Sequence, residues 1–315
     1  MLKLHFFNVA EGDSILLEYE GGKAPFRVLV DTGRAVLLKS KGSLRRTAAS
    51  QLKKLKIDFI DVLVLTHLHV DHIQNLPEIL KSVRFGSIYS AYFPPDPAKR
   101  IADIRSDLKA VRELPKDLNT LAESIRTADK SGTKKIPVTG DMFIPLDQTY
   151  GSILIRIPVE NTLVYQNSVY DQMFHGEPVS EEIIYRAAKS RNNNSLRLLI
   201  KYAGIVIALD GDYYAIDAEK EHQGQCDILK VAHHGDKKSM TEKLASMLRP
   251  KYAVISCMRE YDAEKDRPSK NTAYFLRKYG AEVLYTDCFE ESGFQPQYHD
   301  EILIGINENG TIQVF

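Results

Sequence analysis

Three histidines and one aspartate fall within six consecutive positions, and both residue types bind metal ions. The segment reads Thr66-His67-Leu68-His69-Val70-Asp71-His72. Imidazole and carboxylate groups suit borderline cations such as zinc. Alternate residues of an extended segment point the same way, so His67 and His69 can reach one metal while Asp71 and His72 turn toward a second. The alternative is a histidine-rich surface loop, but the whole chain has only nine histidines, which makes this register improbable by chance.

Two later segments carry residues of the same types directly after apolar runs. Asp210-Gly211-Asp212 follows the run 204–209, and His233-His234-Gly235 follows the run 227–232. A simple turn rich in Asp and Gly would look like the first of them. A histidine pair at a strand end, in a chain that already has a metal motif, favours a ligand. Both segments are candidates to complete the metal site.

The apolar pattern predicts the elements that position these segments. A buried strand over 60–66 ends on the histidines, and a helix from about 71 to 83 follows them. Other strands are predicted over 3–9, 14–19, 26–31, 152–158, 195–201, 204–209, 227–232, 252–257, 282–286, 301–306 and 311–315, and other helices over 44–55, 180–189, 240–248 and 271–279. Strands that alternate with helices indicate a layered α/β domain. We expect a single domain over 1–315.

Residues 90–136 differ from the rest, because apolar residues recur there at helical spacing in a highly charged background. We expect a helical insertion at about 90–136, made of two amphipathic helices split near Pro115. A layer that covers the sheet is the favoured interpretation. A lid over the site or a dimer surface is the alternative.

The overall composition is that of a soluble globular protein. Lys and Arg number 42, as do Asp and Glu, so the net charge is zero. This balance gives no general attraction for nucleic acid or an anionic membrane, although it does not exclude a local basic patch. No apolar run approaches the roughly 20 residues that span a bilayer, and no signal peptide is visible. Cys226, Cys257 and Cys288 do not form a disulfide framework, so we expect a cytoplasmic protein without a membrane partner.

Short motifs along nearly the whole chain resemble, in order, those of the hydrolase domain of ComEC-type competence proteins and their free-standing relatives, a branch of the metallo-β-lactamase superfamily. The matching segments are 7–14 (FNVAEGDS), 30–33 (VDTG), 66–72 (THLHVDH), Gly140-Asp141 with Pro158, 192–196 (NNNSL), 210–212 (DGD), 229–235 (LKVAHHG), 267–269 (RPS) and 285–287 (YTD). Each segment is weak alone, but their shared order is strong. The resemblance implies an α/β fold, the four-layer αββα metallo-β-lactamase sandwich of two mixed β-sheets flanked by helices.

The same resemblance implies a site for two divalent metal ions, with zinc expected and manganese or iron as alternatives. The implied ligands are His67 and His69 for the first ion, Asp71, His72 and His234 for the second, and Asp212 as the bridge between them. Asp71 would also hydrogen-bond the attacking water. His233 would lie beside the substrate, where it could donate a hydrogen bond or protonate the leaving group.

Three more residues receive supporting or open assignments. Asp31 would steady the histidine loop, because carboxylates behind metal ligands orient them. Lys230 could help to bind an anion, but a solvated lysine at a strand end is the favoured interpretation. Ser269 belongs to the segment that resembles an "HPS" motif, in which Arg267 replaces the histidine.

The chain departs from the superfamily pattern where many members supply a third histidine to the first metal. Asn192-Asn193-Asn194 stands there instead. The first metal would then be bound weakly, or through an amide such as that of Asn193. We therefore expect the ion held by His67 and His69 to be the less occupied one.

Metal-assisted hydrolysis is the chemistry that these residues predict, and a phosphodiester is the substrate class that the resemblance favours. The substrate would be a small molecule or a nucleotide, with nucleic acid as a further candidate. A carboxylic-ester, lactone or thioester hydrolase on the same site is the runner-up, and a degenerate binding module is the third alternative. The chain has neither a GxSxG elbow nor a P-loop, so serine-hydrolase and nucleoside-triphosphatase chemistry lack support.

Overall fold

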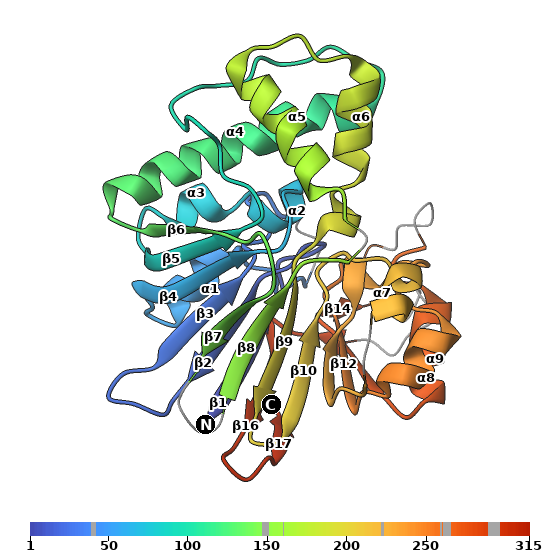
Figure 1. Cartoon of the computed structure of the whole chain (residues 1–315). Coiled ribbons are helices and arrows are strands. Elements are labelled where there is room, and N and C mark those ends of the chain that lie inside the picture. Colours follow the sequence, from blue (N-terminus) through green and yellow to red (C-terminus); the bar gives the residue numbers. More distant parts are fainter. Residues whose placement is uncertain are drawn as a thin grey trace.

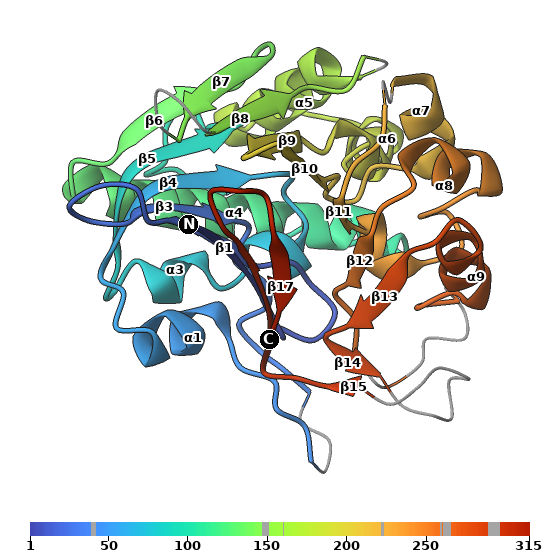
Figure 2. The same cartoon turned by 90° about the horizontal axis from the view of Figure 1, so that it is seen from below.

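Two large mixed β-sheets pack face to face and are covered by helices on both outer faces (Figures 1 and 2). The computed structural model describes residues 1–38, 42–146, 151–159, 161–221, 224–258, 260, 266–288 and 297–315. Within these ranges the first sheet has the order β17 (Ile312–Val314), β16 (Glu301–Ile306), β1 (Leu2–Phe7), β2 (Ile15–Tyr19), β3 (Phe26–Val30), β4 (Phe59–Leu65), β5 (Arg84–Ser90) and β6 (Lys134–Pro137). The second has the order β13 (Glu282–Tyr285), β12 (Tyr252–Ile255), β11 (Ile228–Lys230), β10 (Ile205–Leu209), β9 (Arg197–Tyr202), β8 (Gly151–Arg156) and β7 (Met142–Pro145).

The helices divide between the two outer faces of the sandwich. The first sheet carries α1 (Ala48–Lys54), α2 (Val70–Ile73), α3 (Leu76–Ile79) and α4 (Lys109–Lys130), with α5 (Leu163–His175) and α6 (Glu181–Lys189) packed beyond α4. The second sheet carries α7 (Ala215–Glu221), α8 (Glu242–Leu248) and α9 (Lys270–Lys278). A short ribbon of β14 (Asp287–Cys288) and β15 (Gln297–Tyr298) lies at the end of β13.

Alternation along the strands explains why both faces of each sheet are apolar. Val62 and Val64 of β4 point into the core between the sheets, whereas Leu63 and Leu65 point into the core under the helices. Successive strand residues face opposite sides, so a continuous apolar run belongs to a strand that is covered twice. The predicted four-layer αββα sandwich is confirmed. That residues 1–315 form one domain stays a prediction.

The predicted pair of helices in the insertion is wrong, because α4 runs unbroken through Pro115. Proline removes the hydrogen bond to the Val111 carbonyl and costs about 3 kcal/mol in a helix interior. Five apolar side chains on one face of α4 are completely buried, namely Val111, Leu114, Leu118, Leu121 and Ile125. Each contributes roughly 1.5–3 kcal/mol on burial, which outweighs the cost of the proline. The favoured expectation of a covering layer agrees with this packing, and the insertion ends in strand β6 of the first sheet.

Two other helix predictions also need correction. The helix expected over 71–83 is two short helices, α2 and α3, because Pro77 occupies the first turn of α3 and favours a new start there. Helix α5 was not predicted at all, because its apolar and polar residues do not separate onto two clear faces. Its Val169, Tyr170 and Phe174 are nonetheless buried against the same core as α4. No helix in the described part of the chain is both long and apolar enough to cross a membrane.

His5 links three neighbouring strands of the first sheet through contacts with two carboxylates. His5 of β1 lies between Glu18 of β2, at 3.3 Å, and Glu301 of β16, at 2.7 Å. Burial alone would lower the pKa of His5, but the two carboxylates raise it above 6.5. The hydrogen bond with His5 in turn lowers the pKa of Glu18 to about 2.

We predict that His5→Gln destabilises the protein more at pH 6 than at pH 9. A raised pKa in the folded state means that the stabilisation is complete below the unfolded value near 6.5 and is lost as the pH rises through the folded value. The expected cost at pH 6 is about 1–3 kcal/mol, typical of hydrogen bonds to charged groups. Urea unfolding at both pH values measures it. An equal cost at pH 6 and pH 9 would contradict the charged state of His5.

Candidate metal centre

The candidate ligands meet where parallel strands of both sheets end. In the first sheet β3 and β4 are parallel neighbours, and Asp31 and residues 66–72 follow their carboxyl ends. In the second sheet β10 and β11 are parallel neighbours, and residues 210–212 and 233–235 follow theirs. Helix α2 marks this edge in Figure 1, beneath the cap formed by α4, α5 and α6. The residues that carry the chemistry are thus held on the ends of rigid strands.

The structure brings the six predicted ligands into two adjoining groups. His67, His69 and Asp212 form one group, and Asp71, His72 and His234 form the other, with the ligand atoms of each group within 4.8 Å of one another. The two oxygens of Asp212 divide between the groups. Its Oδ2 lies 3.6 Å from His67 Nε2, and its Oδ1 lies 3.3 Å from His72 Nε2. This is the placement that a bridging carboxylate requires.

The hydrogen bonds of His72 and His234, in the second group of ligands, direct one nitrogen of each ring toward a place where a cation can bind. His72 Nδ1 lies 2.7 Å from Asp31 and His234 Nδ1 lies 3.2 Å from the Ser256 carbonyl, so each ring has an acceptor for its Nδ1 proton. In their neutral form the two rings then present lone pairs at Nε2. Among the described residues neither Nε2 atom has a hydrogen-bond partner, and neither has Asp212 Oδ1, although all three atoms are buried. Acceptors that face one another in a buried site are satisfied by a metal ion.

Burial and charge set the protonation of the imidazoles in the metal-free protein. Burial holds the pKa of His67 and of His69 well below 6.5, which keeps both in the neutral form that binds metal. For His72 the carboxylates of Asp212 and Asp31 overcome burial and raise the pKa well above 6.5. Metal binding therefore has to displace a proton from this histidine.

Asp31 sits behind the histidine loop, where the resemblance implied it would be. Its carboxylate accepts hydrogen bonds from the Thr66 backbone N–H at 2.8 Å and from the Thr66 hydroxyl at 2.6 Å, besides facing His72. It is completely buried. One side chain thus fixes both the start of the loop and the orientation of a ligand.

The expectation that Lys230 is solvated is wrong. Its side chain is completely buried, forms an ion pair with Asp13, and donates to the Gly211 carbonyl at 3.3 Å. Asp13 itself can join His72 and Asp212 in a third candidate group of ligand atoms. Sequence reasoning missed Asp13, and the only available signal was its place in the segment 7–14. The lysine places a fixed positive charge beneath the carboxylates of the site.

Two backbone features shape the loops around the ion pair of Lys230 and Asp13. The Asp13 backbone N–H donates to the Asp71 carbonyl at 3.2 Å, and a Cβ on Gly12 would lie 2.5 Å from that same carbonyl oxygen. On the other side His233 and His234 both have left-handed backbones, with φ of 47° and 55°. Such conformations cost about 1–3 kcal/mol in residues other than glycine. The strained turn sends His234 into the metal ligands and His233 to the wall beside them.

Two of the residues with open assignments are absent from the candidate ligand groups among the residues that the structure describes. Asn193 donates to Asp217 at 3.3 Å and is absent from the candidate ligand groups of the described residues. Ser269 precedes α9, and its backbone N–H donates to the Gly235 carbonyl at 2.6 Å. No third imidazole joins His67 and His69 within the described part of the chain. Lower occupancy of the first metal stays a prediction.

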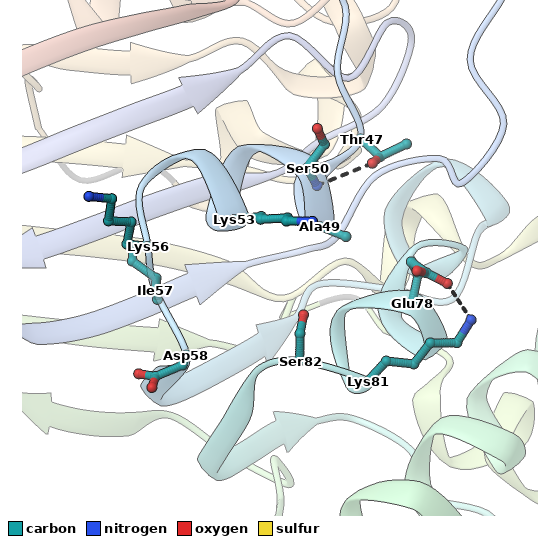
Figure 3. Close-up of a pocket in the computed structure, with 10 residues that line it drawn as sticks. All are labelled: Thr47, Ala49, Ser50, Lys53, Lys56, Ile57, Asp58, Glu78, Lys81 and Ser82. Atoms are coloured by element: carbon teal, nitrogen blue, oxygen red, sulfur yellow. Dashed lines mark hydrogen bonds and ion pairs between the residues drawn. The ribbon is translucent and has the colours of Figure 1, made fainter.

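A cleft of about 440 Å³ opens onto the candidate metal ligands, and His69, Asp71 and Asp212 line it. Its charged lining consists of Arg34, Lys109, Lys189, Arg191, Lys237, Lys238 and Arg267, against Asp71, Glu113, Asp212 and Asp236. A larger surface cavity of about 570 Å³ lies between α1 and α3 (Figure 3), but none of the candidate ligands lines it. We therefore assign the site to the smaller cleft.

Arg191 connects the insertion to the metal loop. Its Nη1 donates to Asp117 of α4 at 2.6 Å and to the Leu68 carbonyl at 3.0 Å. Burial raises the pKa of Asp117 to about 6 despite this partner. The covering helix is thereby tied by hydrogen bonds to the backbone between His67 and His69.

We predict that Asp31→Ala weakens metal binding by roughly 10- to 100-fold, the usual effect of removing a group that orients a ligand. The reason is that His72 loses the acceptor that holds its ring. Competition with a chromophoric chelator measures the affinity, and Asp103→Ala, on the exposed surface, is the matched control. Unchanged affinity in Asp31→Ala would contradict this role.

We predict that Lys230→Met destabilises the metal-free protein by roughly 3–5 kcal/mol, because a buried carboxylate loses its partner. Asp13→Asn in the same chain should restore part of the loss, since a neutral amide needs no cation. Urea unfolding of both variants measures this, with Lys201→Met on the exposed side of β9 as control. Equal instability of the single and double variants would overturn the pairing.

Comparisons with known proteins agree with this geometry. The family model described as the metallo-beta-lactamase superfamily matches residues 10–129, which include the whole segment 66–72. ComE operon protein 3 of Bacillus subtilis (strain 168) is 30% identical over 131 residues, which are 40% of this chain and 15% of that protein. The match thus spans only a small part of the relative's length.

Solved structures with similar chain traces have low sequence identity. The metallo-beta-lactamase fold protein YhfI from Bacillus subtilis is 13% identical, with a TM-score of 0.48 over 90% of this chain and 95% of that one. Zn(2+)-bound PqqB from Methylobacterium extorquens is 9% identical, with a TM-score of 0.45 over 90% and 98%. The family match over residues 10–129 and the clustered histidine and aspartate ligands show that this part of the chain is similar to the metallo-beta-lactamase superfamily.

Proposed function

We propose that this chain is a phosphodiesterase that works with two divalent metal ions, zinc first among them and manganese or iron as alternatives. The observation that carries the choice of substrate is the charge of the cleft. Lys109, Lys189, Lys237 and Lys238 are exposed at its mouth. An anionic substrate is attracted by such a rim, although the chain as a whole is neutral.

The dimensions of the cleft favour a small substrate. About 440 Å³ lies within the range of small-molecule sites and suits a nucleotide-sized phosphodiester. A nucleic acid end is a further candidate, and salt separates the two. Binding of a polymer that contacts several phosphates weakens steeply as the salt concentration rises, whereas that of a mononucleotide does so less.

The residues around the ligands have distinct tasks in this reaction. Divalent ions held there would supply Lewis acidity and make water acidic enough to react at neutral pH. Asp71 has one carboxylate oxygen 3.4 Å from His234 Nε2 and lines the cleft, so it would accept a hydrogen bond from the attacking water and orient it. His233 forms the wall beside Asp212, with 3.8 Å between its Nε2 and Asp212 Oδ2.

The test is hydrolysis of bis(4-nitrophenyl) phosphate by the metal-reconstituted protein, compared with 4-nitrophenyl acetate. We predict that the phosphodiester is the better substrate, and that Asp71→Asn lowers kcat/KM by about 1,000-fold, within the usual range for a group that handles the reacting proton. Asp58→Asn, in the cavity of Figure 3, is the control and should keep the wild-type rate.

Three outcomes would argue against this function. Faster cleavage of the carboxylic ester would favour an esterase on the same site. An unaffected rate in Asp71→Asn would remove the proposed role of that carboxylate. Failure to bind stoichiometric metal after reconstitution would favour a non-catalytic binding module.

A further inference from the structure

Arg267 is buried in the wall of the cleft, and its surroundings restrict what its neighbour can do. Only 6% of its surface is exposed. Its Nη1 forms an ion pair with Glu11, and its Nη2 lies 2.7 Å from His233 Nε2 and 3.7 Å from Asp236. It lines the same cleft as Asp71 and Asp212.

The direction of the hydrogen bond to His233 follows from chemistry alone. A guanidinium has only donors, so His233 Nε2 is the acceptor. The amide nitrogen of Asn192 lies 3.2 Å from the same atom. The proton of the neutral ring then sits on Nδ1, which faces Asp236 at 2.7 Å. In this arrangement the ring atom of His233 nearest the metal ligands has no proton to give to a substrate.

We propose that Arg267 is the residue that binds an oxygen of the phosphoryl group, and that His233 and Glu11 position its guanidinium. This inference rests on the proposed phosphodiesterase function. The planar fork of arginine matches phosphate oxygens in a way that a single imidazole does not. Arg267 Nε has no hydrogen-bond partner among the described residues although it is buried, so the guanidinium has unused donor capacity.

A second arginine, Arg34, also contacts the carboxylate of Glu11. Arg34 lies 3.7 Å from Glu11 and 3.8 Å from Asp71, while Arg267 pairs with the other oxygen of Glu11. Glu11 thus holds two guanidinium groups that both line the cleft. Burial alone would lower the pKa of Arg267, but the negative charges of Glu11, and to a smaller extent of Asp212, Asp236 and Asp71, raise it. A site with permanent cations on its wall suits an oxygen that stays anionic throughout the reaction.

The variants Arg267→Gln, Arg267→Lys and His233→Gln test the assignment in the metal-reconstituted protein. We expect Arg267→Gln to lower kcat/KM for bis(4-nitrophenyl) phosphate by about 100-fold, the typical loss for one donor to a developing oxyanion. Arg267→Lys should lose about 10-fold, because it keeps the charge without the fork. Added guanidinium ion should restore part of the activity of Arg267→Gln. Arg126→Gln, on the exposed face of α4, is the matched control.

The positioning role of His233 has its own readout. If His233 acts through Arg267, His233→Gln loses less than Arg267→Gln, and the double variant is no worse than Arg267→Gln alone. If the two losses multiply, His233 acts on the substrate independently and the assignment is overturned. Glu11 keeps Arg34 as a partner in Arg267→Gln, so the substitution leaves no buried carboxylate without a cation.

Binding of inorganic phosphate separates this inference from the proposed function. Titration calorimetry on the metal-loaded wild type and Arg267→Gln should show at least about 10-fold weaker binding in the variant, at equal metal content. Arginine-dependent phosphate binding without hydrolysis would leave the inference standing and remove the phosphodiesterase function. Hydrolysis and phosphate binding at wild-type levels in Arg267→Gln would overturn the inference alone, and a wild type that neither hydrolyses the diester nor binds phosphate would overturn both.

Discussion

Asp212 faces imidazole nitrogens on both sides, and the protons of two of those rings are held by other acceptors. His72 is turned toward Asp31 and His234 toward a backbone carbonyl, so in the neutral form that binds metal their remaining nitrogens meet the carboxylate as lone pair against lone pair. Without a cation such an arrangement is unfavourable, because buried acceptors lose water and gain nothing in return. The strand ends, the strained histidine turn and the supporting aspartate all serve to keep these acceptors converged.

Two buried cationic side chains, Lys230 and Arg191, lie close to the carboxylates of the metal site. Lys230 lies below it and pairs with Asp13, and Arg191 lies behind the loop between His67 and His69. Neither is a ligand. Each compensates for carboxylates that the site has gathered into a buried place, and each also ties together segments far apart in the chain. Lys230 pairs with a residue 217 positions away, and Arg191 bonds to a carbonyl 123 positions away.

The contiguous part of the site was readable from the sequence, and the part assembled by distant contacts was not. Residues 66–72 carry four candidate ligands in one motif, so their chemistry is visible without the fold. Asp31 could be placed only through the resemblance. The burial of Lys230 was missed because its partner, Asp13, is brought to it only by the packing of the two sheets. The contacts of His233 with Arg267 and Asp236 were missed because these residues reach it through loops whose path the local pattern does not encode.

In the fold, too, some elements could be predicted from the local sequence and others could not. Strands that are covered on both faces leave continuous apolar runs, and most of them were located to within two residues. Helix α4 was predicted as two helices because local propensity favours a break at Pro115, whereas the buried face of the helix outweighs it. Helix α5 was missed for a different reason: its apolar residues lack a clear helical spacing, and only the packing of Val169, Tyr170 and Phe174 into a core makes the helix evident.

The guanidinium on the wall of the cleft has a consequence for which bonds can be broken. Arginine keeps its proton at any pH at which a protein stays folded, so it can stabilise an anionic phosphoryl oxygen but cannot protonate the departing one. The departing alkoxide would then receive no proton from this wall of the cleft. Catalysis should therefore depend steeply on how acidic the alcohol is, with phenols leaving more readily than sugar hydroxyls. The wall of the cleft would in this way select its substrate by the basicity of the departing group as well as by shape.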